Sequence, residues 1–174
     1  GVITPNTNMV IGAKYLVGPK PITDTHPYSN LSISQIIQKS SNIGTAKIAM
    51  NNLSAEEMWN FYTSVGLGQA PKIGFPGAVA GTVHPYKKWM PTDQARIAFG
   101  YGISGSLFQV ARAYTIFARD GELVPLTIER SPEFKPGTHI ISAKTAIEMR
   151  SMMESVTEPG GTAIKAQAEG YRVG

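Results

Sequence analysis

The chain has 174 residues, of which 42% are hydrophobic and 16% are charged, and its formal net charge is +4. This length suits one compact domain or a large piece of one, and the apolar fraction is sufficient for a core. The basic residues are scattered except for Lys87-Lys88, so we expect no nucleic-acid partner. The absence of cysteine excludes disulfides and thiolate chemistry. Residues 1–3 resemble neither a natural start nor a targeting signal, which predicts a piece of a longer protein.

The first third of the chain predicts strands followed by two short helices. Residues 1–30 hold many prolines and glycines between short apolar runs, a pattern typical of short strands or a hairpin. Ser32 or Ser34 offers an N-cap for a helix that ends near residues 40–42. A second helix is predicted from there to Met50.

The clearest local signature is the S-x-x-E capping box formed by Ser54 and Glu57. It opens a helix that we expect to end at Gly66, and its apolar residues follow helical spacing: Met58, Phe61, Tyr62 and Val65. The stretch 66–91 is rich in glycine and proline, which predicts a long loop that forms a cleft wall or a surface excursion.

Two more helices are predicted in the middle of the chain. Thr92 or Asp93 can cap a short helix through Ala98. Residues 99–102 then predict a tight turn of the chain, in which glycine permits a positive φ or a close approach of the backbone. The next helix is expected to carry its apolar residues on one face: Leu107, Val110, Ala111, Tyr114 and Phe117.

The last third predicts one strand and one helix. Residues 123–128 have the character of a short strand or extended segment. Ser142 opens a helix that residues 159–161 terminate, and residues 169–174 are expected to lead into a strand. The predicted shared face of this helix contains Ala146, Met149, Met153 and Val156.

Several common kinds of site are disfavoured. His26, His84 and His139 lie far apart without a metal-ligand spacing, so we expect no metal. The glycines at 66 and 68 lack the rest of a phosphate-binding loop. The twelve acidic residues are dispersed, and no pair stands out for glycoside cleavage.

The stretch Ser40-Ser41-Asn42 lies at the predicted junction of two helices. Its small polar side chains can cap a helix, or they can face a cleft and contact a substrate. An S-x-N pattern by itself favours capping, so the surrounding sequence has to decide between these interpretations.

That surrounding sequence resembles the class B penicillin-binding proteins, which are peptidoglycan D,D-transpeptidases. Residues 38–45, Gln-Lys-Ser-Ser-Asn-Ile-Gly-Thr, are similar to the second active-site motif of this family. Further stretches follow in the family's order: 74–77, 99–102, 107–114, 120–121 and 155–163. The resemblance covers most of residues 22–174 and is strongest to the cell-division enzymes of the penicillin-binding protein 2 or 3 type.

The resemblance implies an α/β fold with a five-stranded antiparallel sheet and helices on both faces. We expect residues 1–174 to be part of one transpeptidase domain, rich in the helical lobe and containing few strands of the sheet. No lysine in the chain has a serine three residues before it, so the S-x-x-K motif is expected upstream. The K-T-G motif is expected downstream, because Lys144-Thr145-Ala146 ends in alanine and lies in a helical pattern.

The resemblance also implies roles for individual residues. Ser40 would relay a proton between the absent lysine and the leaving amine, and Asn42 would hydrogen-bond the backbone amide of the bound stem peptide. Ser41 would point away and support the turn, and Lys39 would be solvated.

The implied substrate is a peptidoglycan stem peptide that ends in D-Ala-D-Ala, which β-lactam antibiotics imitate. The parent protein would be a periplasmic enzyme with one membrane anchor and division-machinery partners, and it would need no metal or cofactor. Two alternatives share the fold: a β-lactam hydrolase or sensor, and a catalytically inactive scaffold of the division machinery. The hydrolase would require an acid that activates water, and the sequence places none for that purpose.

Overall fold

A computed structural model describes residues 3–130, 133 and 135–174. The chain divides into two compact units. The first unit comprises Gly1–Leu53, Met90–Phe99 and Glu148–Gly174, and the second comprises Ser54–Trp89 and Gly100–Ile147.

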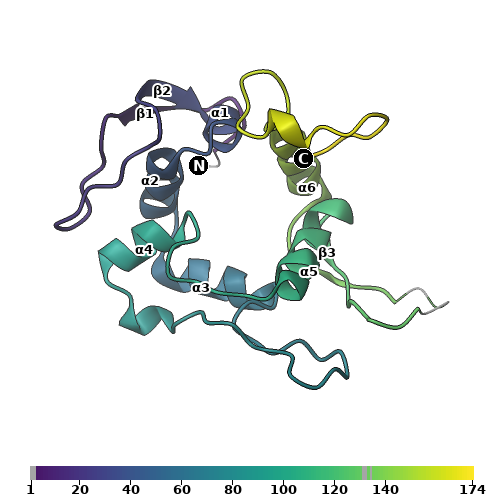
Figure 1. Cartoon of the computed structure of the whole chain (residues 1–174). Coiled ribbons are helices and arrows are strands. Elements are labelled where there is room, and N and C mark those ends of the chain that lie inside the picture. Colours follow the sequence, from purple (N-terminus) through teal and green to yellow (C-terminus); the bar gives the residue numbers. More distant parts are fainter. Residues whose placement is uncertain (1–2, 131–132, 134) are drawn as a thin grey trace. The chain divides into compact units, whose positions relative to one another are not determined.

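The first unit begins with an antiparallel hairpin (Figure 1). Strand β1 (Asn8–Gly12) pairs with β2 (Tyr28–Ser32). Ile11 is 1% exposed whereas the preceding Val10 is 70% exposed, because successive side chains of a strand point to opposite faces. Of the short strands or hairpin predicted for the first thirty residues, the structure shows this antiparallel pair.

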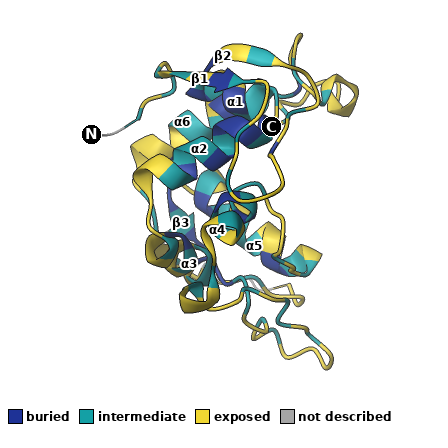
Figure 2. Cartoon of the chain, turned by 90° about the vertical axis from the view of Figure 1, so that its left-hand side faces the viewer, coloured by how far each residue is buried: buried dark blue, intermediate teal, exposed yellow. Residues whose placement is uncertain are grey.

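Three helices of the first unit pack with the hairpin around one core (Figure 2). They are α1 (Ile33–Gln38), α2 (Asn42–Asn52) and α4 (Pro91–Ile97). The core consists of Ile11, Ile22, Leu31, Ile33, Ile36, Ile43, Ala46, Ala95 and Met152. The prediction of two helices on either side of residues 40–42 is confirmed.

The start of α4 differs from its prediction. Thr92 and Asp93 were expected as N-caps, but the helix begins at Pro91 with Met90 in the cap position. Proline fits the first helical position because its φ is already helical and its missing N–H has no partner to lose there. Asp93 instead accepts a hydrogen bond from the Met90 N–H at 2.8 Å.

Helix α6 (Ala143–Glu154) begins where the sequence predicts. The Ser142 Oγ accepts a hydrogen bond from the Thr145 N–H at 3.1 Å, and residues 144–146 are helical. The predicted shared face contains the buried Ala146, and Met152, which lies outside that face, is also buried, at 8% exposure. Met152 packs in the core of the first unit, whereas Met153 is half-buried.

The tail of the chain folds back onto the end of α6. After the short 3₁₀ helix η2 (Ile164–Ala166), residues 169–174 are not themselves part of a described strand, and their expected lead into a strand stays a prediction. The Thr157 hydroxyl donates to the Val173 carbonyl at 2.9 Å. The Arg172 guanidinium hydrogen-bonds Glu154 and holds the pKa of that carboxyl below its usual range.

The second unit begins with α3 (Ala55–Ser64). The predicted capping box is present, since Ser54 Oγ accepts from the Glu57 N–H and Glu57 accepts from the Ser54 N–H. Gly66 follows with φ of +92°, which confirms it as the left-handed stop. The 3₁₀ helix η1 (Tyr86–Lys88) packs against α3.

Helix α5 (Leu107–Ala118) is confirmed as a helix, and most of its predicted apolar face is exposed. Leu107 is 84% exposed and Tyr114 is 54% exposed. The buried residues are Gln109 and Ile116, which lie on a different face. Ile116 forms a small core with Val65 and Leu123, and polar contacts of Gln109 fix this orientation.

The strand expected at residues 123–128 is shorter than predicted. Strand β3 (Glu122–Leu123) pairs antiparallel with β4 (Thr138–His139). Pairing stops before Pro125, which lacks an N–H. The Val124 N–H donates to the Thr115 hydroxyl instead of to a neighbouring strand. The described chain is thus a mixture of helices and few strands, and none of its helices is long and apolar enough to cross a membrane.

Candidate active site

The junction between α1 and α2 is a tight helix ending followed at once by a new helix. The Ser40 N–H donates to the Ile37 carbonyl at 3.1 Å, and the Ser41 N–H donates to the Ile36 carbonyl at 3.0 Å. These two hydrogen bonds form a Schellman motif, in which the residue after the C-cap adopts a left-handed conformation. That residue is Ser40.

Ser40 therefore occupies a position that glycine usually holds. Its φ is +52°, and it is one of two non-glycine residues with positive φ in the described chain. The left-handed region costs about 1 kcal/mol for a residue with a Cβ atom. A hydroxyl side chain at this strained position is consistent with a function that glycine cannot perform.

The middle residue, Ser41, performs the helix capping. Its side chain is buried, and its Oγ accepts a hydrogen bond from the Gly44 N–H at 2.9 Å. The same hydroxyl donates to Asp24 Oδ2 at 2.6 Å, while Asp24 Oδ1 accepts from the Ile43 N–H at 2.9 Å. Asp24 and Ser41 together satisfy the first N–H groups of α2. The expectation that Ser41 supports the turn agrees with these contacts.

Gly44 allows α1 and α2 to approach closely. A Cβ atom at this position would lie 2.6 Å from Cγ1 of Ile36, which is fully buried. Such a contact is too short for any real side chain, so a residue larger than glycine would push the helices apart. The junction is therefore held rigidly by packing as well as by hydrogen bonds.

The residues before Ser41 contact the segment that follows α6. Gln38 Nε2 donates to the Ser155 carbonyl at 3.2 Å, and Lys39 Nζ donates to the Gly160 carbonyl at 2.6 Å. Lys39 is half-buried, and its exposed hydrogen bond joins two segments far apart in sequence, which the expectation of a solvated side chain did not include.

The Ser40 and Asn42 side chains are not used for helix capping. Ser40 is exposed, and its Oγ shares a hydrogen bond of 3.2 Å with the Thr162 hydroxyl. Asn42 is half-buried, and its Nδ2 donates to the Thr23 carbonyl at 3.2 Å. Capping by Ser41 and Asp24 thus leaves one hydroxyl and one carboxamide on a fixed junction. Their expected orientation toward one shared groove stays a prediction.

Sequence reasoning missed Asp24, Thr23 and Thr162 as partners of this site. Asp24 lies in the proline-rich approach to β2, where an aspartate is an ordinary turn residue, so no local signal identified it. In the described residues, no three histidine, aspartate or glutamate side chains gather in a way that could hold a metal ion.

Comparisons with known proteins agree on one family. The family model for the penicillin binding protein transpeptidase domain matches residues 1–174. The chain is 45% identical to a probable peptidoglycan D,D-transpeptidase PenA of Neisseria gonorrhoeae over 92% of this chain and 27% of that protein. It is 31% identical to the peptidoglycan D,D-transpeptidase FtsI of Escherichia coli K12 over 99% of this chain and 29% of that protein.

A solved structure agrees in fold. The transpeptidase domain of penicillin-binding protein 3 from Burkholderia pseudomallei is 50% identical and superposes with a TM-score of 0.93. This match covers 98% of the present chain and 52% of the solved one. The chain thus spans between a quarter and a third of the length of these two curated relatives and about half of the solved domain.

Proposed function

Because the chain belongs to the penicillin-binding protein transpeptidase domain family, we propose that it is the S-x-N-bearing part of a peptidoglycan D,D-transpeptidase. The observation that carries the proposal is that some residues of the helix junction cap α2, while the side chains of others take no part in the cap. Ser41 and Asp24 cap α2, so the side chains of Ser40 and Asn42 are available for chemistry.

The proposed reaction is acyl transfer through an ester of an active-site serine. That serine attacks the carbonyl of the penultimate D-alanine of a stem peptide, and a lysine accepts its proton. The carbon–nitrogen bond breaks, and the terminal D-alanine leaves as an amine. An amine of a neighbouring stem peptide then attacks the ester and releases the serine. Residues 1–174 contain no S-x-x-K sequence, so other parts of the protein would supply the serine and lysine.

In this scheme Ser40 and Asn42 act on the two sides of the scissile bond. The Ser40 hydroxyl passes the proton from the lysine to the leaving amine, which needs a donor and acceptor in one group. The Asn42 carboxamide hydrogen-bonds the backbone amide of the stem peptide. Both side chains are short and stand on a junction fixed by capping and packing, and such rigidity matters because a displacement of about 1 Å can cost about 100-fold in rate.

The same site would react with a β-lactam, which imitates the donor peptide and stops at the acyl-enzyme. We place the complete protein on the periplasmic side of the inner membrane with a single anchor and division-machinery partners. Support for this location comes from the similarity to FtsI and PenA.

Replacing Asn42 by alanine in the complete protein tests the site. We expect the second-order rate constant for acylation by a fluorescent penicillin to fall about 100-fold or more, as is typical when a hydrogen bond to the reacting group is lost. The matched control is Asn51→Ala, which removes an exposed asparagine from the same helix.

The control variant should retain the rate of the unmodified protein, and both variants should keep its melting temperature within a few degrees. An unchanged acylation rate in Asn42→Ala would remove this residue from the site. Complete lack of labelling in the unmodified protein would favour the inactive scaffold, and steady turnover of the β-lactam would favour the hydrolase.

A further inference from the structure

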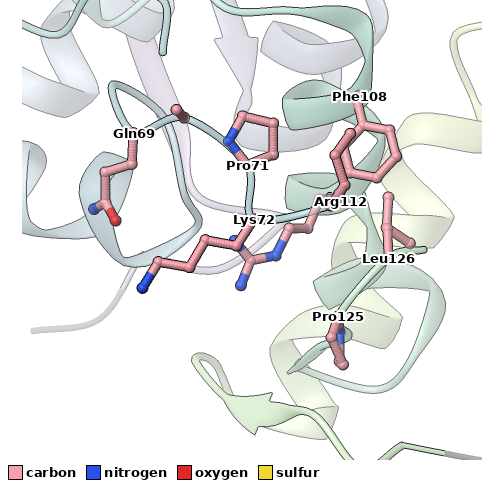
Figure 3. A pocket seen from close by; sticks show the side chains of 9 residues that line it. Gln69, Pro71, Lys72, Phe108, Arg112, Pro125 and Leu126 are labelled. Carbon is pink, nitrogen blue, oxygen red and sulfur yellow. The ribbon is translucent and has the colours of Figure 1, made fainter. Parts of the chain in front are cut away.

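A second site of interest lies in the second unit, away in sequence from the S-x-N stretch. A cavity of about 320 Å³ is lined by the loop after α3, by α5 and by the segment after β3 (Figure 3). Two of its lining residues, Lys72 and Arg112, are positively charged, and none of its lining residues is acidic. Figure 3 shows the Arg112 side chain running from α5 toward Lys72.

The two cations have no acidic partner among the described residues. Among the residues that the structure describes, neither Lys72 nor Arg112 forms an ion pair or a side-chain hydrogen bond. Arg112 is nevertheless half-buried. A partly desolvated guanidinium without a counter-charge is unfavourable, so this arrangement fits an anion that arrives from outside.

The space around Arg112 is formed by a glycine. A Cβ atom at Gly66 would lie 2.8 Å from Arg112 Nη1, and Gly66 has φ of +92°. Any larger residue at this position would be strained and would push the guanidinium aside. The backbone therefore leaves room for the charged group at the wall of the cavity.

A buried glutamine fixes the loop wall to the helix. Gln109 is 2% exposed, and its Nε2 lies 3.2, 2.9 and 2.7 Å from the carbonyl oxygens of Gly66, Gln69 and Ala80. Its Oε1 accepts from the Ser106 N–H at 2.8 Å. Because Arg112 stands on the same helix, the loop with Lys72 and the helix with Arg112 are held in a set arrangement, which is the condition for a preformed site.

Apolar side chains form part of the remaining walls. Phe108 lies one helical turn before Arg112, and Pro125 and Leu126 come from the segment after β3. The Val124 N–H donates to the Thr115 hydroxyl at 3.0 Å, so this segment is also attached to α5. In Figure 3, Phe108 and Leu126 stand together on one side of the cavity.

We propose that the Lys72–Arg112 cavity binds a peptide segment of a partner protein, with one acidic side chain at the two cations and an apolar side chain against Phe108 and Leu126. The planar guanidinium of arginine matches a carboxylate in two parallel hydrogen bonds, and Lys72 adds a second positive charge. The volume is at the low end for ligand sites, which suits one or two side chains better than a large cofactor. An inorganic anion would leave the apolar walls unused.

The test uses the complete protein and two small probes, N-acetyl-Leu-Glu-amide and N-acetyl-Leu-Gln-amide. Binding is followed by nuclear magnetic resonance titration. We expect the glutamate probe to bind at least about tenfold more tightly than the glutamine probe, since one charge-assisted pair distinguishes them. Arg112→Gln and Lys72→Gln should each reduce this difference, whereas Lys88→Gln, an exposed lysine of the same unit, should retain it.

Lys72→Gln serves as the independent test if Arg112→Gln unfolds, because Lys72 is exposed on a loop. Equal binding of the two probes, no binding of either, or a difference that survives both substitutions would overturn the proposal. Inorganic phosphate that binds as tightly as the glutamate probe would also overturn it, by showing a site for free anions. Because none of the measurements uses penicillin, a failure here is distinct from a failure of the proposed transpeptidase function.

Discussion

Ser40 has a backbone conformation that glycine would adopt more easily and a side chain that glycine lacks. Its φ of +52° completes the Schellman ending of α1, while its hydroxyl contacts Thr162. The fold alone would favour glycine at this position. We interpret the serine as a residue retained for its hydroxyl, at some cost to stability.

A pair of substitutions separates these two properties. Ser40→Ala removes the hydroxyl and keeps the strained Cβ, whereas Ser40→Gly removes both. In the complete protein we expect Ser40→Gly to have a free energy of unfolding about 1 kcal/mol above that of Ser40→Ala, because only glycine relieves the left-handed strain. Both variants should be acylated by penicillin far more slowly than the unmodified protein.

Chemical denaturation and penicillin labelling measure the two effects. Equal stability of the two variants would mean that the positive φ carries no cost in this context. Rapid acylation of either variant would show that the Ser40 hydroxyl is dispensable, and it would count against the proton relay.

At the scale of helices and strands, local signals were predictable and distant contacts were not. The capping box of Ser54 and Glu57 lies within four residues, so its pattern could be read directly from the sequence. The buried face of α5 could not be read from the sequence, because it is decided by the contacts of Gln109 with loop carbonyls up to 43 residues away. An apolar stripe favours burial, but the contacts of the buried Gln109 carboxamide with carbonyl oxygens of the loop outweighed it here.

At the S-x-N junction, too, the local structure was predictable and the distant contacts were not. The positions of the two helices followed from apolar spacing and small polar residues around Ser41. The partners that fix the site, Asp24 and Gly160, are 17 and 121 residues from the side chains that they contact. Lys39 was therefore expected to be solvated, since nothing near it in the sequence indicates a carbonyl acceptor.

The capping box of α3 leads to a prediction of pH dependence. The Ser54 N–H and then the Ser54 hydroxyl donate to Glu57 and lower the pKa of its carboxyl. A carboxyl whose folded pKa is lowered stabilises the fold above its unfolded pKa of about 4.3, and this contribution is lost as the pH falls through the lower folded value.

The comparison is between the unmodified protein and Glu57→Gln, which keeps the shape but does not titrate. We expect the unmodified protein to melt at the higher temperature at pH 7, and the difference to shrink as the pH falls from about 4.3 toward the lowered pKa. Thermal denaturation at a series of pH values measures this. A difference that is constant from pH 7 to the acid limit would show that the carboxylate form contributes nothing to the cap.

At the scale of the whole molecule, the family could be recognised from sequence because several stretches occur in a set order. The overall composition of helices and few strands also agrees with the expected α/β class. What sequence could not give is the arrangement within each unit, such as the return of the tail onto α6 through Arg172 and Glu154. That return uses an exposed ion pair and one carbonyl contact, and neither leaves a periodic pattern in the chain.

The last prediction concerns residues 1–174 made as a separate chain. We expect this chain to form no covalent adduct with a fluorescent penicillin, because none of its lysines follows a serine at the spacing that activates the nucleophile in this family. Ser40 does not replace it, since its hydroxyl contacts Thr162 and no described lysine amine hydrogen-bonds it. Labelling followed by denaturing gel electrophoresis measures the adduct, with the complete protein as the positive control. A fluorescent band on the separate chain that Ser40→Ala abolishes would make Ser40 itself the nucleophile and would overturn the assignment of the proton relay.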